Sequence, residues 1–527
     1  MHRTLTRRLL LTLAAAPGAA NAQSFCEPVA PDSIAGAVVL GNGTPGSVTT
    51  AQLQMALDAG GAIRIDQGAS PSTIVVTQPL VASRNTVLDG GGLVTLSGGD
   101  AHRILRLTNP NPAQNAPQVF VTLQNIGFVD GRTTEGRGGA IYKQHDFEFP
   151  HKVNLKLVNC SFLRNDAPLD GSSQDDGGGA FYGELLNRID IGNCTFDDNS
   201  GSNGGAVYSL VSLRLNIVDS VFSNNRAIGT GGNPGNGGNA GALGVDGGAR
   251  LVDVCRTRFV DNSSNAHGAG FFSVMYDQQS RTRFEDVEFR DNLQIATDRH
   301  TGGAYIQDGP WAMERVSFIG NEAQGFGGLF VAGNAPGTIR NATFSNNVAR
   351  TGLGAAMALS NSAPISIVNT TIANNNAGAF AAGISIGTPN QLRLTNVVFA
   401  NNTGGNVFVN WAMNNPAAFD GGGNMQWPQV RQSGMTNGGN ETPVTATSQF
   451  ADALLPNAPS DNGGEVPTLA LPANSPARDS GVGVIGGTGE AVPATDARGA
   501  PRFGGVDRGS YEFQDPQGIF ANGFEGP

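Results

Sequence analysis

The sequence predicts an all-β protein, a right-handed parallel β-helix (a solenoid) with an N-terminal cap and a small C-terminal β/loop region. A large apolar anchor residue recurs ten times at intervals of 26 to 37 residues, which is the range of solenoid repeats. Apolar residues near the anchors alternate along the chain as they do in strands, and 75 glycines favour turns over helices. The ten anchors are Phe128, Phe162, Phe196, Phe222, Phe259, Phe289, Phe318, Phe344, Ile372 and Phe399.

Nine of the ten anchors are followed by asparagine three positions later. Successive coils of a parallel β-helix lie about 4.8 Å apart, so the anchors should stack in one inner column and the asparagines in another. An amide side chain in every coil can bond to its neighbours and satisfy backbone groups of the turns that would otherwise be buried unpaired. We therefore assign a structural role to Asn165, Asn199, Asn225, Asn262, Asn292, Asn321, Asn347, Asn375 and Asn402.

The chain divides into five parts. Arg3, Arg7 and Arg8 precede a short apolar run and a small-residue cleavage site at 20–22, so residues 1–22 are predicted to be a signal peptide for export from a bacterial cell. The general and twin-arginine export routes both remain open. The other parts are the N-terminal cap and first coils (23–115), the β-helix repeats (116–410), the C-terminal coils and region (411–513) and a tail (514–527).

The N-terminal cap is expected to contain one helix. Thr50 is a suitable capping residue for a helix over residues 51–58, and Gly60 is suited to end it. A helix at the open end of a β-helix covers the core and blocks edge-to-edge association.

Four cysteines are present, and export permits disulfides. Cys160 and Cys194 each lie two residues before an anchor in adjacent coils, so they are candidates for a disulfide or for a reduced stack inside the solenoid. Cys255 lies four residues before its anchor, on the outward side, and Cys26 lies far away near the N-terminus. We leave these two as candidates for free thiols.

Charge excludes two classes of partner. The net charge is −11, and residues 1–22 hold three arginines and no acid, so the mature chain carries −14. Nucleic acids and anionic membranes require basic stripes, which this chain lacks. No segment of the mature sequence is apolar enough to cross a membrane.

The repeats resemble those of chlamydial polymorphic outer membrane proteins and of right-handed β-helix proteins of the pectin-lyase-like superfamily. The resemblance rests on Phe162 to Asn165 followed by Gly178-Gly179-Ala180, a pairing that recurs in other coils. The C-terminal part resembles the choice-of-anchor region of surface and secreted proteins, through segments 421–424, 461–468, 474–479, 496–499 and 502–512. Arg508 departs from that pattern, which usually has a small apolar residue there. The resemblance implies surface display and no catalytic residues.

The fold also hosts polysaccharide lyases and glycoside hydrolases, so these activities are the alternative. Hydrolases of this kind place two or three carboxylates around a sugar bond. The acidic pair Asp175 and Asp176, in a long loop, is the candidate for such chemistry. The histidines show no metal-ligand spacing and no nucleophile motif is present.

One aromatic column is a candidate binding face. Tyr142, Tyr182 and Tyr208 occupy the same position in three consecutive coils, and Phe272 occupies it two coils later. Their neighbours should point inward, so these rings should point outward and form a ladder suited to a sugar or a partner surface. The alternative is an ordinary exterior stack covered by the long loops.

A second column is acidic. Asp198, Asp261 and Asp291 lie two residues after their anchors, and the last two should stack as a like-charge pair. Oxygen ligands on turns suit a calcium ion, and calcium is the one cofactor for which the sequence offers candidate ligands. The alternative is a row of solvated turn residues.

Together these observations predict an exported protein, secreted or on the outer surface, that acts as a non-catalytic adhesin or glycan-contacting scaffold. A glycan or another component of a host or cell surface is the expected partner, and the chain is expected to be a monomer. A lyase or hydrolase is one alternative, and a passive structural surface protein is another.

Overall fold

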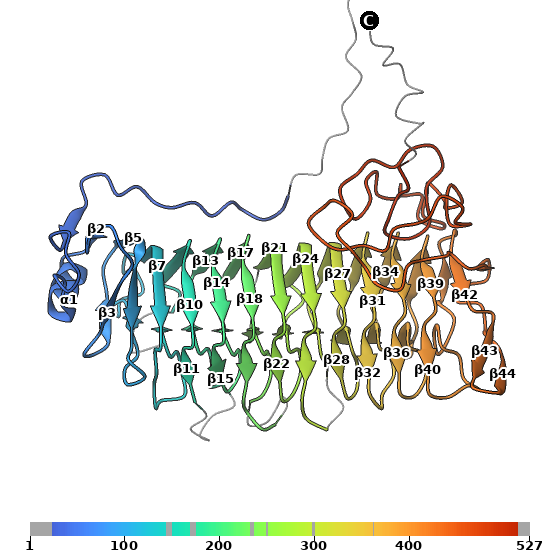
Figure 1. The fold of residues 1–527 in the computed structure, drawn as a ribbon, viewed down its shortest axis with the longest axis horizontal. Helices are drawn as coiled ribbons and strands as arrows, with labels where there is room; N and C mark the ends of the chain where they lie inside the picture. The colour runs from blue at the N-terminus through green and yellow to red at the C-terminus, as the bar shows by residue number, and fades with distance from the viewer. Residues whose placement is uncertain are drawn as a thin grey trace, which may run out of the picture.

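The computed structural model describes residues 24–143, 150–168, 175–231, 237–248, 251–297, 301–361 and 363–514. The predicted signal peptide and nearly all of the predicted tail therefore lie outside the described residues. The chain winds into a right-handed parallel β-helix whose coils stack along one long axis (Figure 1). We call its three parallel sheets A, B and C. The architecture predicted from the repeats is confirmed.

Sheet A begins nearest the N-terminus and has the largest number of strands. Its 23 strands are β1 (Val38–Leu40), β2 (Gly61–Ile65), β3 (Ser72–Val75), β5 (Thr86–Ser97), β7 (Val119–Val129), β9 (Val153–Val158), β10 (Ser161–Leu163), β13 (Arg188–Gly192), β14 (Thr195–Asp197), β17 (Arg214–Val218), β18 (Val221–Ser223), β21 (Leu251–Val260), β24 (Arg281–Arg290), β27 (Trp311–Ile319), β30 (Gly337–Arg340), β31 (Thr343–Ser345), β34 (Ile365–Val368), β35 (Thr371–Ala373), β38 (Leu392–Thr395), β39 (Val398–Ala400), β41 (Phe419–Asp420), β42 (Met425–Trp427) and β45 (Gln449–Phe450).

Sheets B and C complete each coil. The 11 strands of sheet B are β4 (Leu80–Ala82), β6 (Leu105–Leu107), β8 (Ile141–Lys143), β12 (Phe181–Glu184), β16 (Val207–Leu210), β20 (Leu243–Asp246), β23 (Phe271–Val274), β26 (Ala304–Gln307), β29 (Leu329–Gly333), β33 (Met357–Asn361) and β37 (Ile384–Ile386). The nine of sheet C are β11 (Asp166–Ala167), β15 (Ser200–Gly201), β19 (Arg226–Ala227), β22 (Ser263–Ser264), β25 (Leu293–Gln294), β28 (Glu322–Ala323), β32 (Val348–Ala349), β36 (Asn376–Ala377) and β40 (Thr403–Gly404). An antiparallel hairpin of β43 (Val430–Ser433) and β44 (Thr436–Asn440) lies at the C-terminal end.

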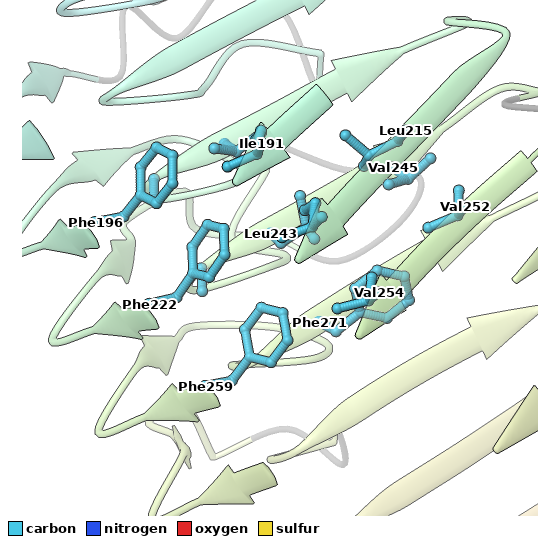
Figure 2. Packing of buried hydrophobic residues seen from close by; sticks show 14 of the residues in the cluster. Ile191, Phe196, Leu215, Phe222, Leu243, Val245, Val252, Val254, Phe259 and Phe271 are labelled. Carbon is cyan, nitrogen blue, oxygen red and sulfur yellow. The ribbon is translucent and has the colours of Figure 1, made fainter. Parts of the chain in front are cut away.

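A column of phenylalanine rings fills one corner of the core. The strand register pairs Phe196 with Phe162 on one side and with Phe222 on the other. From Phe128 to Phe344, successive ring centroids lie 4.5 to 5.0 Å apart and the planes differ by at most 15°. Figure 2 shows Phe196, Phe222 and Phe259 of this column beside the aliphatic side chains of the neighbouring strands. Each such contact contributes about 0.5–1.5 kcal/mol beyond the burial of its area.

The asparagine column forms a continuous hydrogen-bonded ladder. Asn225 Nδ2 donates to the carbonyl of Phe196 and to Asn262 Oδ1, both at 2.9 Å. Asn225 Oδ1 accepts from the backbone N–H of Asn199 at 3.1 Å and from its Nδ2 at 2.9 Å. The same bonds recur along the whole column. Every turn at this corner therefore has its buried polar groups satisfied by the next coil.

The helix α1 (Thr50–Ala59) covers the N-terminal end of the core. Its N-cap is Thr49, one residue earlier than predicted, and a capping box joins Thr49 to Gln52. The reason is that the hydroxyl of Thr50 is buried and accepts a hydrogen bond from the backbone N–H of Thr77 at 3.1 Å instead.

The segment 24–32, which we call the N-terminal strap, runs along the outer face of sheet A from the α1 end toward β24 (Figure 1). Asp32 forms an ion pair with Lys156. Glu27 forms an ion pair with Arg214 at 2.8 Å. The strap therefore covers sheet A over the first half of the repeats.

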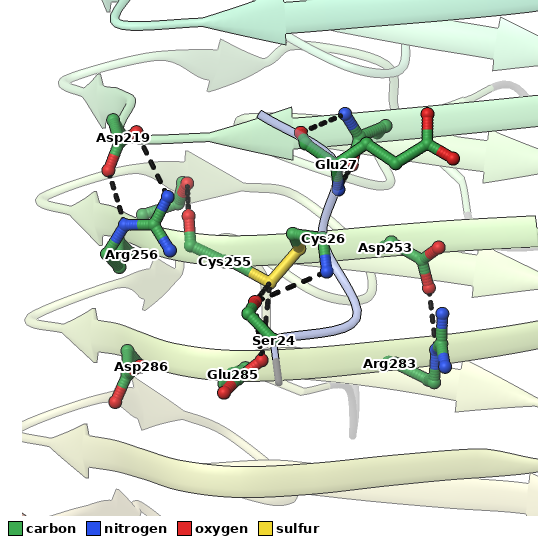
Figure 3. Close-up of a disulfide and its surroundings, with 12 residues drawn as sticks. Ser24, Cys26, Glu27, Asp219, Asp253, Cys255, Arg256, Arg283, Glu285 and Asp286 are labelled. Carbon is green, nitrogen blue, oxygen red and sulfur yellow. Dashed lines mark hydrogen bonds and ion pairs between the residues drawn. A yellow bond between two sulfur atoms is a disulfide. The ribbon is translucent and has the colours of Figure 1, made fainter. Parts of the chain in front are cut away.

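A disulfide between Cys26 and Cys255 fixes the end of the strap, with the two Cα atoms 6.1 Å apart (Figure 3). The expectation of free thiols at Cys26 and Cys255 is therefore wrong. Of the two alternatives for Cys160 and Cys194, the structure has the reduced stack. Cys160 and Cys194 carry free, buried thiols, and the backbone N–H of Cys160 donates to the sulfur of Cys194 at 3.4 Å. Burial raises the pKa of the Cys160 thiol. Cys255 points outward from β21, where a segment from elsewhere in the chain reaches it.

The C-terminal region (residues 451–513) packs on the same outer face of sheet A, over its last coils (Figure 1). Asn341 Oδ1 accepts from Arg502 Nη2 at 3.0 Å. Asn396 Nδ2 donates to the carbonyl of Val482 at 2.8 Å. Asparagines at one corner of successive coils thus attach this region to the solenoid.

Charged residues of the C-terminal motif hold that region together. Arg498 pairs with Asp496 at 2.7 Å, and Arg502 pairs with Glu512 at 2.8 Å. Asp496, Asp507 and Glu512 are buried. Burial raises the pKa of both Asp507 and Glu512. In this chain the charged residues of the motif therefore stabilise the C-terminal region that packs on sheet A.

Candidate functional site

The tyrosine column lies outside the core but is covered. Tyr142, Tyr182 and Tyr208 keep only 3%, 0% and 2% of their surface exposed. Adjacent rings are tilted, with centroids 5.8 and 6.0 Å apart, and the Arg103 guanidinium lies 4.2 Å above the ring of Tyr142. Phe272 is equally buried. The expected exposed ladder is therefore wrong as a binding face, because no ring has a face open to a sugar.

The buried layer around the tyrosines contains a carboxyl group, that of Asp246, whose pKa is raised. Tyr208 Oη donates to Asp246 Oδ2 at 3.1 Å, and burial raises the pKa of Asp246 from 3.8 to about 6. A raised pKa means that this group stabilises the fold below pH 4 and that its contribution is lost as the pH rises through 6.

Asp246→Asn is therefore expected to be about 3 kcal/mol more stable than the natural chain at pH 7 and equally stable at pH 3, because the amide carries no charge to desolvate. Thermal unfolding of both proteins between these pH values measures the difference. Parallel stability curves at all pH values would contradict it.

The acidic pair predicted in the long loop belongs to the same buried layer. Asp176 is 1% exposed, and its Oδ1 accepts from Arg137 Nε at 2.8 Å. The Arg137 guanidinium lies over the ring of Tyr182 at 5.4 Å. Neither Asp175 nor Asp176 lines the groove described below. Asp176 is therefore buried and engaged in an ion pair with Arg137.

The second acidic column is explained by the backbone. Asp198, Asp261 and Asp291 have φ angles of 52°, 56° and 54°, and Asn224 and Gly320 at the same position have 55° and 65°. Only glycine and, among other residues, mainly asparagine and aspartate adopt this left-handed conformation readily. Burial and the charge of Asp261 raise the pKa of Asp291. Among the described residues, no group of three His, Cys, Asp or Glu side chains is arranged to hold a metal ion.

Three neighbouring pockets lie on the outer face of sheet A, and we call them together the sheet-face groove. Three adjoining sections have volumes of 560, 640 and 600 Å³. The first and second sections share Asp286 and Glu465, and the second and third share Thr338. Its eight carboxylates are Asp219, Glu285, Asp286, Glu288, Glu314, Asp461, Glu465 and Glu490. Its eight arginines are Arg256, Arg258, Arg283, Arg290, Arg315, Arg340, Arg393 and Arg498.

Three parts of the chain build the groove. Outward-facing residues of β21, β24, β27 and β30 form its floor, and residues 459–467 and 493–499 of the C-terminal region form one wall. The strap ends at the other side, where the Phe25 ring lies 4.1 Å from the Arg283 guanidinium. Ser24 Oγ donates to Glu285 Oε2 at 2.8 Å (Figure 3). The groove is the part of sheet A that lies between these two coverings.

At one corner of sheet A, the residue type differs between the earlier coils and the coils of the groove. In earlier coils this corner holds Asn125, Asn159 and Asn193, with φ angles of 50° to 53°. Asn159 Nδ2 donates to Asn125 Oδ1, and Asn193 Nδ2 donates to Asn159 Oδ1, both at 2.8 Å. These three residues form a second, outer asparagine ladder.

In the groove, that corner carries alternating charges instead. Arg256 binds Asp219 through Nε at 2.6 Å and Nη2 at 3.1 Å. Arg315 binds Asp286 in the same way, at 2.7 and 3.0 Å. Both arginines have left-handed backbones, with φ angles of 43° and 51°. Left-handed backbone conformations are uncommon for arginine and are concentrated at functional sites. This row of charged residues is therefore a candidate functional feature of the groove.

A second row of charges lies beside it. Glu285, Glu314 and Arg340 are neighbours in register on β24, β27 and β30. Arg315 Nη2 lies 2.5 Å from Glu285 Oε1, and Asn341 Nδ2 donates to Glu314 Oε1 at 2.8 Å. Burial raises the pKa of Glu314. In this row two carboxylates are followed by an arginine, at the coil spacing of about 4.8 Å.

Glu288 is the least satisfied carboxyl of the first section. Its side chain is 3% exposed, yet Oε1 accepts no hydrogen bond from any described residue, and Arg290 Nη1 lies 3.4 Å away as an ion pair. Arg258 is its neighbour in register on β21. Burial raises the pKa of Glu288. The carboxylate therefore has one long ion pair and no hydrogen bond with the described residues, although buried polar groups are nearly always hydrogen-bonded.

The third section is more apolar. Pro310, Pro336 and Pro364 each precede a strand of sheet A in successive coils and line this section. Phe419 is 44% exposed, and the Arg393 guanidinium lies 4.9 Å above its ring. These residues form an exposed ring and proline surface at the end of the groove.

Comparisons with known proteins bear on the fold. The family model for the right-handed β-helix region matches residues 272–419. Tailspike protein 3 of bacteriophage CBA120 is structurally similar with a TM-score of 0.38 and 10% identity, over 69% of this chain and 58% of the tailspike. PfbA, a surface adhesin of Streptococcus pneumoniae, is similar with a TM-score of 0.31 and 12% identity, over 76% of this chain and 97% of the adhesin. A search of curated proteins finds no match. No helix of the described segments has the length and apolar character needed to cross a membrane.

Proposed function

We propose that this protein binds a glycan chain in the sheet-face groove and acts as a non-catalytic adhesin or glycan-contacting scaffold. The row of neighbouring pockets carries the proposal. Three sections of 560 to 640 Å³ are linked in turn by shared lining residues, and each alone is in the size range of a small-molecule site. A groove of this length suits a polymer.

The lining supports a glycan as that polymer. Sugar hydroxyls both donate and accept hydrogen bonds, and the floor offers arginines beside carboxylates in successive coils. The Phe419 ring and the three prolines offer a flat surface for the apolar face of a sugar ring.

The cysteines support export. Disulfides persist in oxidising compartments outside the cytosol, and Cys26–Cys255 lies directly after the predicted signal peptide 1–22. We propose that the mature chain begins near residue 23 and is secreted or displayed on the outer surface, as the choice-of-anchor resemblance implies. N-terminal sequencing of the exported protein tests this, and an intact residue 1 on the exported chain would contradict it.

Blocking the groove tests the binding proposal. Ala312 faces outward from β27 in the second section, and Thr338 lies where the second and third sections meet. Ala312→Trp and Thr338→Trp should each weaken binding on a polysaccharide array at least about tenfold, because an indole fills space that a sugar would occupy. The matched control is Leu293→Trp on sheet C, which is 38% exposed and lies outside the groove. Equal binding by all four proteins would contradict the proposal.

The same assay addresses both alternatives. Reducing ends and unsaturated products are measured on every polysaccharide that binds. Product release would favour a hydrolase or lyase over an adhesin. No binding to any polysaccharide would favour a passive structural protein.

A further inference from the structure

We infer that the ligand of the sheet-face groove is an uncharged polysaccharide, and that Glu288 accepts a hydrogen bond from one of its hydroxyls. The inference rests on the proposed glycan binding and adds to it the chemical class of the chain and the residue that selects it.

The charge of the groove supports an uncharged ligand. Its lining holds as many arginines as carboxylates, although the mature protein carries a net charge of −14. Several of these charges neutralise one another directly: Arg256 binds Asp219, and Arg315 binds both Asp286 and Glu285. A charged polymer would meet as many like charges as opposite charges in this lining, and an anionic one would also be repelled by the protein as a whole. Hydroxyl groups, in contrast, bond equally well to both kinds of side chain.

The position of Glu288 supports its role as the selecting residue. Its carboxylate lines the first section of the groove and accepts no hydrogen bond from a described residue, while Oε1 has only the long ion pair with Arg290 at 3.4 Å. A sugar hydroxyl can donate that hydrogen bond. Arg258, in register beside it, pairs with no carboxylate among the described residues and can donate to a neighbouring hydroxyl oxygen. The two side chains together are therefore arranged to bind a pair of adjacent hydroxyls.

The ligand class is tested by titration calorimetry on exported, disulfide-bonded protein. The uncharged probes are dextran, β-glucan and galactomannan, and the charged probes are polygalacturonate, dextran sulfate and chitosan. We expect binding to at least one uncharged probe, with a Kd that changes less than about twofold between low and high salt, since no net charge is neutralised. Binding to charged probes alone, lost in Ala312→Trp, would overturn the uncharged class while leaving glycan binding in place. Absence of binding to every probe would overturn both.

The role of Glu288 is tested by two variants. Glu288→Ala should raise the Kd for the bound uncharged probe about tenfold or more, because a buried acceptor is lost. Glu288→Gln should keep the Kd within about threefold, because its amide oxygen still accepts a hydrogen bond. Glu322→Ala on sheet C, 41% exposed at its side chain, is the matched control. Thermal unfolding checks that each variant is folded. A Glu288→Ala protein that is folded and binds unchanged would overturn the assignment.

Discussion

Replacing Asn225 by alanine is expected to lower the free energy of unfolding of the central coils by about 4 kcal/mol. The variant leaves the carbonyl of Phe196 and the backbone N–H of Asn199 buried without their partners. Each buried backbone group without a hydrogen bond costs about 1–3 kcal/mol, and the lost side-chain packing adds to this.

Because a solenoid unfolds in neighbouring units, hydrogen exchange of the amides around coils 196–262 is the appropriate measurement. The matched control is Asn376→Ala. This residue directly follows Asn375, which belongs to the ladder. Asn376 is exposed, and its side chain makes a single bond to Thr403 Oγ1 at 2.9 Å, so the control should lose less than about 1 kcal/mol. Equal losses in both variants would show that the ladder has no special role.

Removing the disulfide with Cys26→Ser and Cys255→Ser together is expected to lower the free energy of unfolding by about 4 kcal/mol. The bond closes a loop with a sequence separation of 229 residues, and long loops gain the most from closure. The strap should also detach from the groove, since Ser24 and Phe25 are held beside Glu285 and Arg283. Weaker binding of the polysaccharide ligand would follow.

Thiol titration provides the direct check on this pairing. The natural protein should show no reactive thiol when folded, because Cys160 and Cys194 are buried. After denaturation without reductant it should show two. Four thiols under those conditions would contradict the disulfide.

Much of the fold was predictable because it repeats. The anchor and asparagine columns recur at similar spacings, so one physical argument about stacking applied to every coil, as with Phe196 and Asn199. The recurring positions of the turn asparagines and aspartates could be predicted for the same reason. Why these residue types occur there could not be predicted, because the left-handed backbone at residues such as Asp261 and Asp291 is known only from the φ angles of the structure.

The groove was not predictable, because its walls come from distant segments. Phe25, Arg283 and Glu465 are separated by more than 150 residues from one another, and no spacing connects them. The signal that was available is the change at one corner from asparagine to Arg256 and Arg315. The prediction for the tyrosine column failed because strand alternation shows only that a ring points outward, and other side chains cover these rings.

Hydroxyl-radical footprinting with the bound polysaccharide tests the central claim most directly. The account predicts protection of Phe25, Pro336 and Phe419, which line the groove. Tyr276 and Met435 are 69% and 104% exposed and lie outside the groove, so their oxidation should not change. Protection of Tyr276 or Met435 with unchanged oxidation in the groove would contradict the claim that this protein binds its ligand on the outer face of sheet A.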